Sequence, residues 1–396
     1  MSPAAEPRGC DEELSRGTLV ACAQARSPLI AAELASLQGA KGKVEAARPF
    51  LPSNPLLTGS LGSRTGGGMS ATNWSVTLAQ ELEVAGQSGL RVDVARGDLV
   101  AQGQQLTVVR AELAEQAWLA WFQALASKER VALALRIEQA SLEVARTAQG
   151  MSTQGLSSPV DAAVADAAAV SASQQRLEAE SAVRAAEIRL RLLVGASATP
   201  RVTGALEPLR WDEASLERPE VASLTALSRA AAHRVELLRR SRAPNPTLSF
   251  FAQNDGFDEK VFGVGLGIPI PLPQPLGRTY SGEIAEAVGA GHRLEAELDR
   301  LTRTLNGERE LASSEYGKRL AARALYSAER LARANHALAA ISTQLSAGRL
   351  SVREALVSQQ ALVGFLEAEV NAREALCAAS VRLIRTHGGS LEGGAL

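Results

Sequence analysis

The chain repeats itself after about 190 residues, and this duplication limits the folds open to it more than any other feature. Two landmarks recur 191 residues later and two recur 193 residues later: Pro28 at Pro219, Asn54 at Asn245, Gly155 at Gly348, and Gly195 at Gly388. Four landmarks in one order at nearly constant offset indicate a tandem duplication. We therefore expect a single architecture that is built twice.

The landmarks divide the chain into two repeats of the same plan. Each repeat is expected to hold a first helix, a β-hairpin, a very long helix and a return helix. Pro and Gly residues punctuate the boundaries, as expected of residues that end regular elements. The predicted ranges are an N-terminal tail at 1–13, the first repeat at 14–198 with its hairpin at about 54–84, a linker at 199–216, the second repeat at 217–388 with its hairpin at about 245–271, and a C-terminal tail at 389–396.

The composition favours long helices. Hydrophobic residues make up 46% of the chain and aromatic residues only 4%, and the commonest residues include good helix formers such as Ala, Leu, Glu and Arg. Helices are expected at about 14–48, 90–150, 222–242 and 279–345, with a return helix after each glycine turn. At ~1.5 Å per residue, a helix over 90–150 reaches roughly 90 Å.

Two groups of side chains in these helices are expected to be core residues. Trp118, Trp121 and Phe122 cluster in the middle of the first long helix. The last helix carries an apolar residue at every seventh position, which predicts a coiled-coil seam: Leu356, Val363, Val370, Cys377 and Ile384. Cys377 is therefore predicted to be a small core residue and not a reactive thiol.

Alternating apolar residues predict strands in each repeat. Small or polar residues separate the apolar positions of these predicted membrane strands, which are Trp74, Val76 and Leu78 in the first repeat and Val264, Leu266 and Ile268 in the second. A period of two is typical of a strand with one apolar face. Strands of about ten residues also have the length that crosses a bilayer at a tilt.

A lone sheet with an apolar outer face cannot sit in lipid, because its edges carry unpaired backbone groups. Closure needs partner chains, and three copies of a four-stranded sheet supply twelve strands, which is an allowed barrel size. The expected fold is thus mainly α with a small membrane β part. It is a duplicated long-helix coiled-coil tunnel with four strands per chain, and three chains form a 12-stranded β-barrel and an α-helical barrel.

Composition and motifs argue against several functional classes. Lys and Arg total 42 and Asp and Glu total 43, so a net charge of −1 provides no basic field for nucleic acid. The three Cys form no C-x-x-C pair, the four His form no H-E-x-x-H, and phosphate-loop and serine-hydrolase signatures are absent. We therefore expect no catalytic, cofactor-binding or metal site and no enzyme. The sequence contains no run of about 18 apolar residues, so no transmembrane helix is expected.

The duplicated order of helix, Asn-Pro, hairpin, long helix, glycine turn and return helix resembles the TolC family of outer membrane efflux proteins over about residues 14–388. The Asn-Pro entry and short loops resemble its heavy-metal branch, which includes CzcC and CusC. A metal channel is expected to show Met or His clusters, whereas 3 Met and 4 His are dispersed here. The motifs that look like the family are Arg218-Pro219-Glu220, Asn245-Pro246-Thr247-Leu248, and Phe262-Gly263-Val264-Gly265-Leu266 through Pro271-Leu272.

The resemblance implies a passive bacterial outer membrane channel of a tripartite efflux system or a system like type I secretion. Such channels are homotrimers with a β-barrel in the outer membrane lipid and a helical tunnel in the periplasm. They dock onto a periplasmic adaptor (membrane fusion) protein and an inner-membrane transporter, and they use no cofactor and bind no nucleic acid. The alternative is a soluble coiled-coil scaffold with no transport role. The hairpins favour the channel, because a scaffold has no use for repeated strands of membrane length.

The resemblance also implies a gate at the periplasmic tips. Asp161 and Glu354 each lie six residues past the turn glycine of their repeat. In a trimer they would form carboxylate rings that attract cations on a narrow aqueous path. They also fit the alternative of solvated carboxylates favoured by a helix N-terminus. Arg349 and Arg353 lie beside Glu354, and pairing with it would weaken such a ring.

The turns themselves resemble the adaptor-docking motif of the family. Each also fits a helix C-cap followed by an N-cap Ser, and the two interpretations are compatible. The docking turns comprise Gly155, Leu156 and Ser157 in the first repeat and Gly348, Arg349 and Leu350 in the second.

Cys10 and Cys22 allow three interpretations. They form a disulfide in an oxidising periplasm, or they stay unpaired, or Cys10 is the acylated N-terminal Cys of a lipoprotein, which some family members have. The segment Arg8-Gly9-Cys10 lacks the apolar stretch that lipoprotein processing needs, and this argues against acylation.

Overall fold

The computed structural model of the chain describes residues 10–66, 68–210, 218–256, 259–272, 277 and 279–391. Positions 1–9 and 392–396 of the predicted tails at 1–13 and 389–396, and positions 211–216 of the predicted linker, lie outside the described residues. In the described part the chain is mainly helical and carries a four-stranded antiparallel sheet, which confirms the predicted combination of long helices and four strands. None of the helices described there is both long and apolar enough to cross a membrane.

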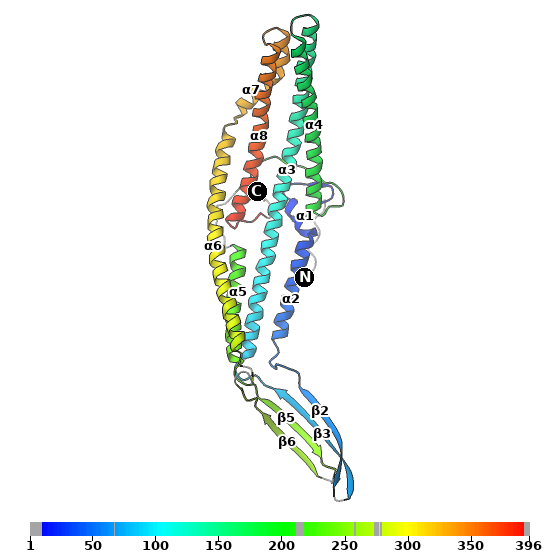
Figure 1. The fold of residues 1–396 in the computed structure, drawn as a ribbon, viewed down its shortest axis with the longest axis vertical. Coiled ribbons are helices and arrows are strands. Elements are labelled where there is room, and N and C mark those ends of the chain that lie inside the picture. The colour runs from blue at the N-terminus through cyan, green and yellow to red at the C-terminus, as the bar shows by residue number, and fades with distance from the viewer. Residues whose placement is uncertain are drawn as a thin grey trace. The chain divides into compact units, whose positions relative to one another are not determined.

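Helices and strands follow one another in the order drawn in Figure 1. The helices are α1 (Leu19–Arg26), α2 (Pro28–Ala47), α3 (Gln87–Thr153), α4 (Pro159–Leu193), α5 (Pro219–Arg240), α6 (Ser281–Ala324), α7 (Ala328–Ser346) and α8 (Val352–Thr386). The strands are β1 (Glu13–Leu14), β2 (Leu56–Gly66), β3 (Met69–Glu81), β4 (Arg201–Val202), β5 (Thr247–Asn254) and β6 (Lys260–Gly267).

The chain forms two compact units, and each unit draws on both halves of the sequence. Unit 1 consists of Met1–Ala31, Val108–Arg218 and Thr304–Leu396, and unit 2 consists of Ala32–Thr107 and Pro219–Arg303. The four-stranded sheet belongs to unit 2, and the return helices α4 and α8 belong to unit 1. The predicted repeats thus describe an order along the chain, and they do not coincide with the compact units.

The single first helix predicted over 14–48 is wrong, because the structure has two helices there. Helix α1 ends at Arg26, and α2 begins at Pro28 after Ser27, which has an extended backbone. The residue before a proline disfavours the helical region, which explains the break. Leu14 lies in β1 instead, where it pairs in parallel with Val202 of β4.

The uninterrupted helix predicted over 279–345 is also wrong. Helix α6 ends at Ala324, and Ser327 caps the start of α7 by accepting a hydrogen bond from the Arg330 backbone N–H. The guanidinium groups of Arg323 and Arg330 donate to the carbonyl oxygens of Tyr326 and Leu325 at 2.7 and 2.8 Å. These bonds satisfy backbone groups that a continuous helix would have satisfied internally, so the break is stabilised. Its counterpart α3 runs through 67 residues without interruption.

Two predicted core features are buried as expected. Trp118, Trp121 and Phe122 are each 1% exposed, and the Trp118 indole N–H donates to the Leu391 carbonyl oxygen at 3.0 Å. Cys377 is a buried free cysteine. Burial raises the pKa of its thiol to about 12, so the thiolate needed for reactivity is scarce at neutral pH.

Cys10 and Cys22 form a disulfide in the structure, with their Cα atoms 5.7 Å apart. Of the three interpretations left open by the sequence, the structure therefore has the paired one. The adjacent Asp11 accepts hydrogen bonds from Arg26 at 2.9 Å and from the Ser197 backbone N–H at 2.8 Å. These bonds, the one from Arg26 foremost, lower the Asp11 pKa from 3.8 to about 2.

Candidate functional site

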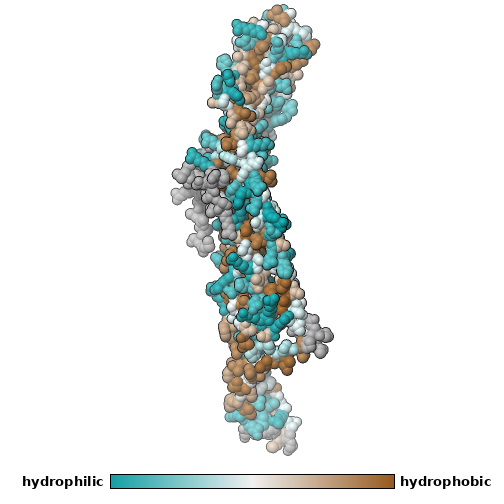
Figure 2. Space-filling model, turned by 90° about the vertical axis from the view of Figure 1, so that its left-hand side faces the viewer, coloured by the Kyte–Doolittle hydropathy of each residue, from teal (hydrophilic) through white to brown (hydrophobic). Residues whose placement is uncertain are grey.

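The four-stranded sheet has the order β2-β3-β5-β6, and every neighbouring pair is antiparallel. Residues directly opposite each other in such pairs share one face of the sheet. One face is apolar and exposed, and a brown band in the lower part of Figure 2 lies where Figure 1 draws the sheet. The exposed large apolar residues on this face are Leu57, Leu61, Trp74, Val76, Leu78, Phe250, Phe262, Val264 and Leu266.

Exposure of a continuous apolar face is unusual for a protein surrounded by water. Leu78 of β3, Phe250 of β5 and Val264 of β6 lie in one register row and are 44%, 52% and 64% exposed. Five of the six predicted membrane-strand positions lie on this face. Ile268 does not, because β6 ends at Gly267. Pro269 lacks the N–H that would continue the ladder, and it restricts the backbone of Ile268 before it.

The opposite face of the sheet carries mostly small and polar residues, with Leu56, Met69 and Val261 as exposed apolar side chains among them. The hydroxyls of Ser60 and Ser75 hydrogen-bond across β2 and β3 at 2.8 Å. Near the hairpin turns, Arg64 pairs with Asp255 at 3.3 Å and so links β2 to the end of β5. The sheet thus has a face suited to lipid and a face suited to water, which is the alternation of a membrane-spanning strand.

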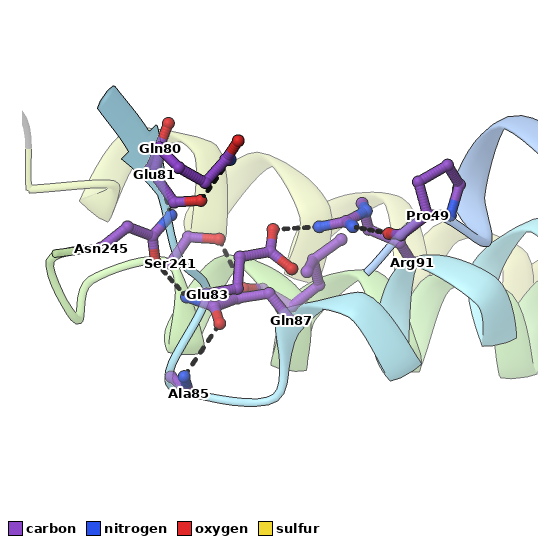
Figure 3. Close-up of polar contacts among 10 residues, drawn as sticks. Pro49, Gln80, Glu81, Glu83, Ala85, Gln87, Arg91, Ser241 and Asn245 are labelled. Atoms are coloured by element: carbon purple, nitrogen blue, oxygen red, sulfur yellow. Dashed lines mark hydrogen bonds and ion pairs between the residues drawn. The ribbon is translucent and has the colours of Figure 1, made fainter. Parts of the chain in front are cut away.

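A polar network lies where the strands join the helices of unit 2 (Figure 3). The Gln87 side-chain N–H donates to the Asn245 side-chain oxygen at 3.0 Å, and Asn245 in turn donates to a Glu81 carboxylate oxygen at 2.8 Å. Gln87 is 3% exposed and also accepts a bond from the Ala85 backbone N–H at 3.0 Å. Asn245 of the Asn-Pro motif is therefore the hub that ties the start of β5 to the turn between β3 and α3.

A second contact in the same view holds the start of α3 (Figure 3). Arg91 forms an ion pair with Glu83, whose side chain is 7% exposed, and it also donates to the Pro49 carbonyl oxygen at 3.2 Å. A buried carboxylate is costly unless it is paired, and Arg91 supplies the opposite charge beside Glu83. The pair fastens the segment after α2 to α3.

The two glycine turns end unit 1 in the same way, and Figure 1 shows both at one end of that unit. Gly155 and Gly348 have φ values of +74° and +69°. The next residues, Leu156 and Arg349, donate their backbone N–H groups to carbonyls five residues earlier at 2.8 and 2.9 Å. This is the Schellman arrangement, in which a left-handed residue closes a helix, and glycine adopts that conformation most easily.

Asp161 and Glu354 both lie in the first turn of the helix that follows each tip turn. Glu354 closes a capping box: its carboxylate accepts from the Ser351 backbone N–H at 2.8 Å, and its own N–H donates to the Ser351 hydroxyl. These bonds, led by the one from the backbone, lower the pKa of Glu354. The carboxylate is thus held in its charged form, with part of its hydrogen-bonding capacity used by the cap.

The arginines beside Glu354 do not neutralise it in this structure. Arg349 and Arg353 are exposed, and no ion pair in the described part of the chain joins either of them to Glu354. Leu156 is 67% exposed in the other turn. The tips therefore present charged and apolar side chains to their surroundings on a backbone that is rigidly closed.

A shared core holds the two tip hairpins together. It contains Ala residues from α4 and larger apolar residues from α3, α7 and α8, with Leu345 fully buried and Val144 1% exposed. Small residues allow close approach of helices, and the larger ones fill the space between them. The core residues are Leu133, Ile137, Val144, Ala148, Ala165, Ala172, Ala334, Leu338, Ile341, Leu345, Val352, Ala355 and Leu366.

The fold is that of known outer membrane proteins. The structure of CusC superposes with a TM-score of 0.79 at 14% identity, covering 94% of this chain and 92% of that one. VceC from Vibrio cholerae superposes with a TM-score of 0.77 at 18% identity, covering 94% and 96%. The open MtrE channel of Neisseria gonorrhoeae gives 0.75 at 16% identity, covering 94% and 89%. Among curated proteins, none matches this chain in sequence.

The fold and the two-faced sheet thus define the class of outer membrane channels with long helices. Residues 19–196 match the sequence profile of the family described as outer membrane efflux protein, and the second half of the chain completes the same fold. The first half of the chain thus carries the sequence profile of the outer membrane efflux proteins, the TolC family, and the described chain has the fold of their channels. Members of this family are efflux channels of the bacterial outer membrane and not enzymes. Channels of this family are trimeric components of efflux systems.

Several functional contacts were not predicted from the sequence. In the sequence Asn245 is a landmark of the duplication and part of a motif that resembles the family, whereas in the structure its side chain is the hub of the junction network. Phe251 of β5 was assigned no role, although it is an aromatic residue on the polar face of the sheet. Its alternation with Phe250 hides it, because two adjacent aromatic residues give no clear period of two. A group of three or more metal-ligating residues is not found among the residues described.

Proposed function

We propose that three copies of this chain form a passive conduit, with a 12-stranded barrel in the outer membrane and a helical tunnel in the periplasm. The observation that carries the proposal is the two-faced sheet with open edges. Strands β2 and β6 have a partner on one side only, and an unpaired edge is not tolerated in lipid. Pairing β6 of one copy with β2 of the next removes every edge after three copies of four strands.

The repeat also supports a specific contact between copies. Within unit 2, α3 and α5 approach so closely that a Cβ added to Gly97 would lie 2.6 Å from the Ala230 Cβ. A step of 193 residues takes Gly97 to Ala290 of α6, and a step of 191 residues back takes Ala230 to Gly39 of α2. Gly39 and Ala290 are both exposed in the single chain. They are the Gly–Ala pair that repeats the close α3–α5 contact between neighbouring copies.

Apolar side chains on the outside of α4 also support association. Helices of a monomer in water seldom expose a continuous apolar stripe. A neighbouring copy would cover this one, just as it would cover Gly39. The exposed apolar residues of α4 are Val160, Val164, Val170, Leu177, Ile188 and Leu192.

The tips of unit 1 are the proposed gate and docking site. Three copies bring Asp161 and Glu354 to the narrow end of the tunnel, where rings of carboxylates favour cations. The turns at Gly155 and Gly348 carry the exposed Leu156 and Arg349, which suit the helical tip of a periplasmic adaptor protein. The adaptor links the conduit to an inner-membrane transporter, which supplies the energy. The resemblance to the heavy-metal branch stays a prediction about the substrate.

The assembly can be tested by disulfide cross-linking. Cys10 and Cys22 are already paired and Cys377 is buried, so any new cross-link comes from the introduced cysteines. A chain with both Gly39→Cys and Ala290→Cys should yield covalent trimers in outer membranes after oxidation. The matched control combines Gly39→Cys with Gly307→Cys, several turns further along α6, and should yield monomers. A soluble monomer or dimer in cell fractions, without cross-linked trimers, would contradict the conduit.

A further inference from the structure

The polar face of the sheet carries one aromatic side chain among its described strand residues, and this is Phe251 in the middle of β5. Its register partners are Thr77 on β3 and Gly263 on β6. The adjacent rows on this face hold small residues such as Ser75, Ala79 and Ser249. The ring thus stands among mostly small and polar neighbours, and Leu56 and Val261 are the larger apolar side chains of the adjacent rows.

The ring lies down on the sheet because Gly263 has no side chain. A Cβ added to Gly263 would lie 2.3 Å from the Phe251 Cζ atom and 2.7 Å from Cε1. The far end of the ring therefore covers the Gly263 backbone, an arrangement that shields a strand glycine. Four residues on, Gly267 is open by comparison, because its nearest neighbour is the Thr247 Cβ at 3.9 Å.

We propose that the Phe251–Gly263 pair sets the width of the channel at the level of the outer membrane. The inference rests on the proposed trimeric barrel, in which the polar face lines the lumen and three such rings lie in one layer. With glycine at 263, the rings rest against the wall and leave the lumen open. Any side chain at 263 occupies the place of the ring, and the ring must then swing away from the sheet toward the lumen.

The effect on transport depends on solute size. Rings that project inward from three sides narrow one layer of the barrel, so large solutes are obstructed more than small ions. Gly263 is therefore a specificity-determining position although it offers no side chain to a solute. Phe251 supplies the large side chain, and the residue at position 263 determines whether its ring lies on the sheet or projects into the lumen.

Thiol labelling of intact cells tests the pair without depending on the periplasmic tip. Ala79 lies on the same face, one register row further from the hairpin turns than Phe251, and Ala71 lies on the turn side. A bulky impermeant maleimide entering from the cell exterior must pass the Phe251 layer to reach Ala79→Cys. It need not pass that layer to reach Ala71→Cys. The native cysteines are paired or buried and stay silent.

Gly263→Val should slow bulky labelling of Ala79→Cys at least several-fold while leaving Ala71→Cys unchanged, and Gly263→Ala should act in the same direction. Adding Phe251→Ala to Gly263→Val should restore the rate. Gly267→Ala, on the same face but with free space, should have no effect. Equal labelling of Ala79→Cys in the Gly263 and Gly267 variants would overturn this inference alone. No labelling of Ala71→Cys in the parent would overturn the proposed barrel, and this inference with it.

Discussion

Asn245 and Gln87 are 158 positions apart in the chain, and the Gln87 side-chain N–H donates to the Asn245 side-chain oxygen at 3.0 Å (Figure 3). This bond connects the Asn-Pro motif of the second half to the turn that begins the long helix of the first half. Because Asn245 also donates to Glu81, one side chain joins β3, β5 and α3 at the level where strands give way to helices.

Asn245→Ala should weaken this junction. The substitution leaves the nearly buried Gln87 amide without its acceptor, and an unsatisfied buried polar group costs about 1–3 kcal/mol. We expect a lower melting temperature of the purified protein and faster proteolysis near residues 82–86. Gln253→Ala, at an exposed position of the same strand, is the control and should melt like the parent. Equal melting of both variants would show that the network carries little stability.

Leu266→Arg should impair membrane insertion. Leu266 lies on the apolar face and is 66% exposed, and a charge there costs about 2–4 kcal/mol near the bilayer midplane. The amount of trimer recovered from outer membranes measures the effect. Ser75→Arg places the same charge on the polar face and should insert normally. Unchanged recovery of the Leu266 variant would count against a lipid-facing strand.

Gly348→Val should destabilise the tip and reduce adaptor cross-linking. The φ of +69° at Gly348 costs an L-residue about 1–2 kcal/mol, and a β-branched residue pays most. Thermal unfolding and cross-linking to the adaptor measure the two effects. Gly364→Ala, within α8 and with no neighbour near its added Cβ, should be neutral or slightly stabilising. Intact cross-linking in both Gly155 and Gly348 variants would place docking elsewhere.

Replacing Asp161 with Asn and Glu354 with Gln should reduce the cation preference of the channel. Each change removes one charge per copy from the proposed ring, and charges at a narrow aqueous constriction act strongly on ions. Because the Glu354 carboxylate already accepts a hydrogen bond from Ser351, the Asp161 variant should have the larger effect on cation preference. Reversal potentials in a salt gradient across planar bilayers measure the preference. Values equal to the parent's would identify both residues as helix-start carboxylates without a gating role.

Acid should weaken the anchoring of the N-terminal segment through Asp11. Its pKa in the folded protein, about 2, lies below the ordinary 3.8, so its ionised form stabilises the fold above about pH 4. This contribution is lost as the pH falls from about 4 to 2. Urea unfolding of the parent and of Asp11→Asn across this range provides the test. The variant should have a flatter pH dependence, and parallel curves would show that the Arg26 pair contributes nothing.

Local patterns were sufficient for much of the architecture. The duplication is recognised from steps of 191 and 193 residues between its landmarks. The strands and turns are recognised from local backbone geometry, namely the alternation around Trp74 and Val264 and the turn glycines at 155 and 348. Such features are readable because a period of two or a left-handed glycine has the same meaning in any context. No local pattern predicts the break between α6 and α7. Bonds from Arg323 and Arg330 stabilise it, and neither residue is a helix breaker.

Contacts between distant residues were decided by the tertiary structure alone. Only strand register brings the Phe251 ring onto Gly263, and a shift of one residue would have sent that ring to the apolar face. Likewise, only the packing of α1 against the end of the first repeat brings Arg26 and Ser197 to Asp11. Apart from the two helix breaks at Ser27 and after Ala324, the sequence by itself determined which elements form and on which face of a strand each side chain falls. Which faces meet depends on the free energy of packing the whole chain, and no local pattern records that.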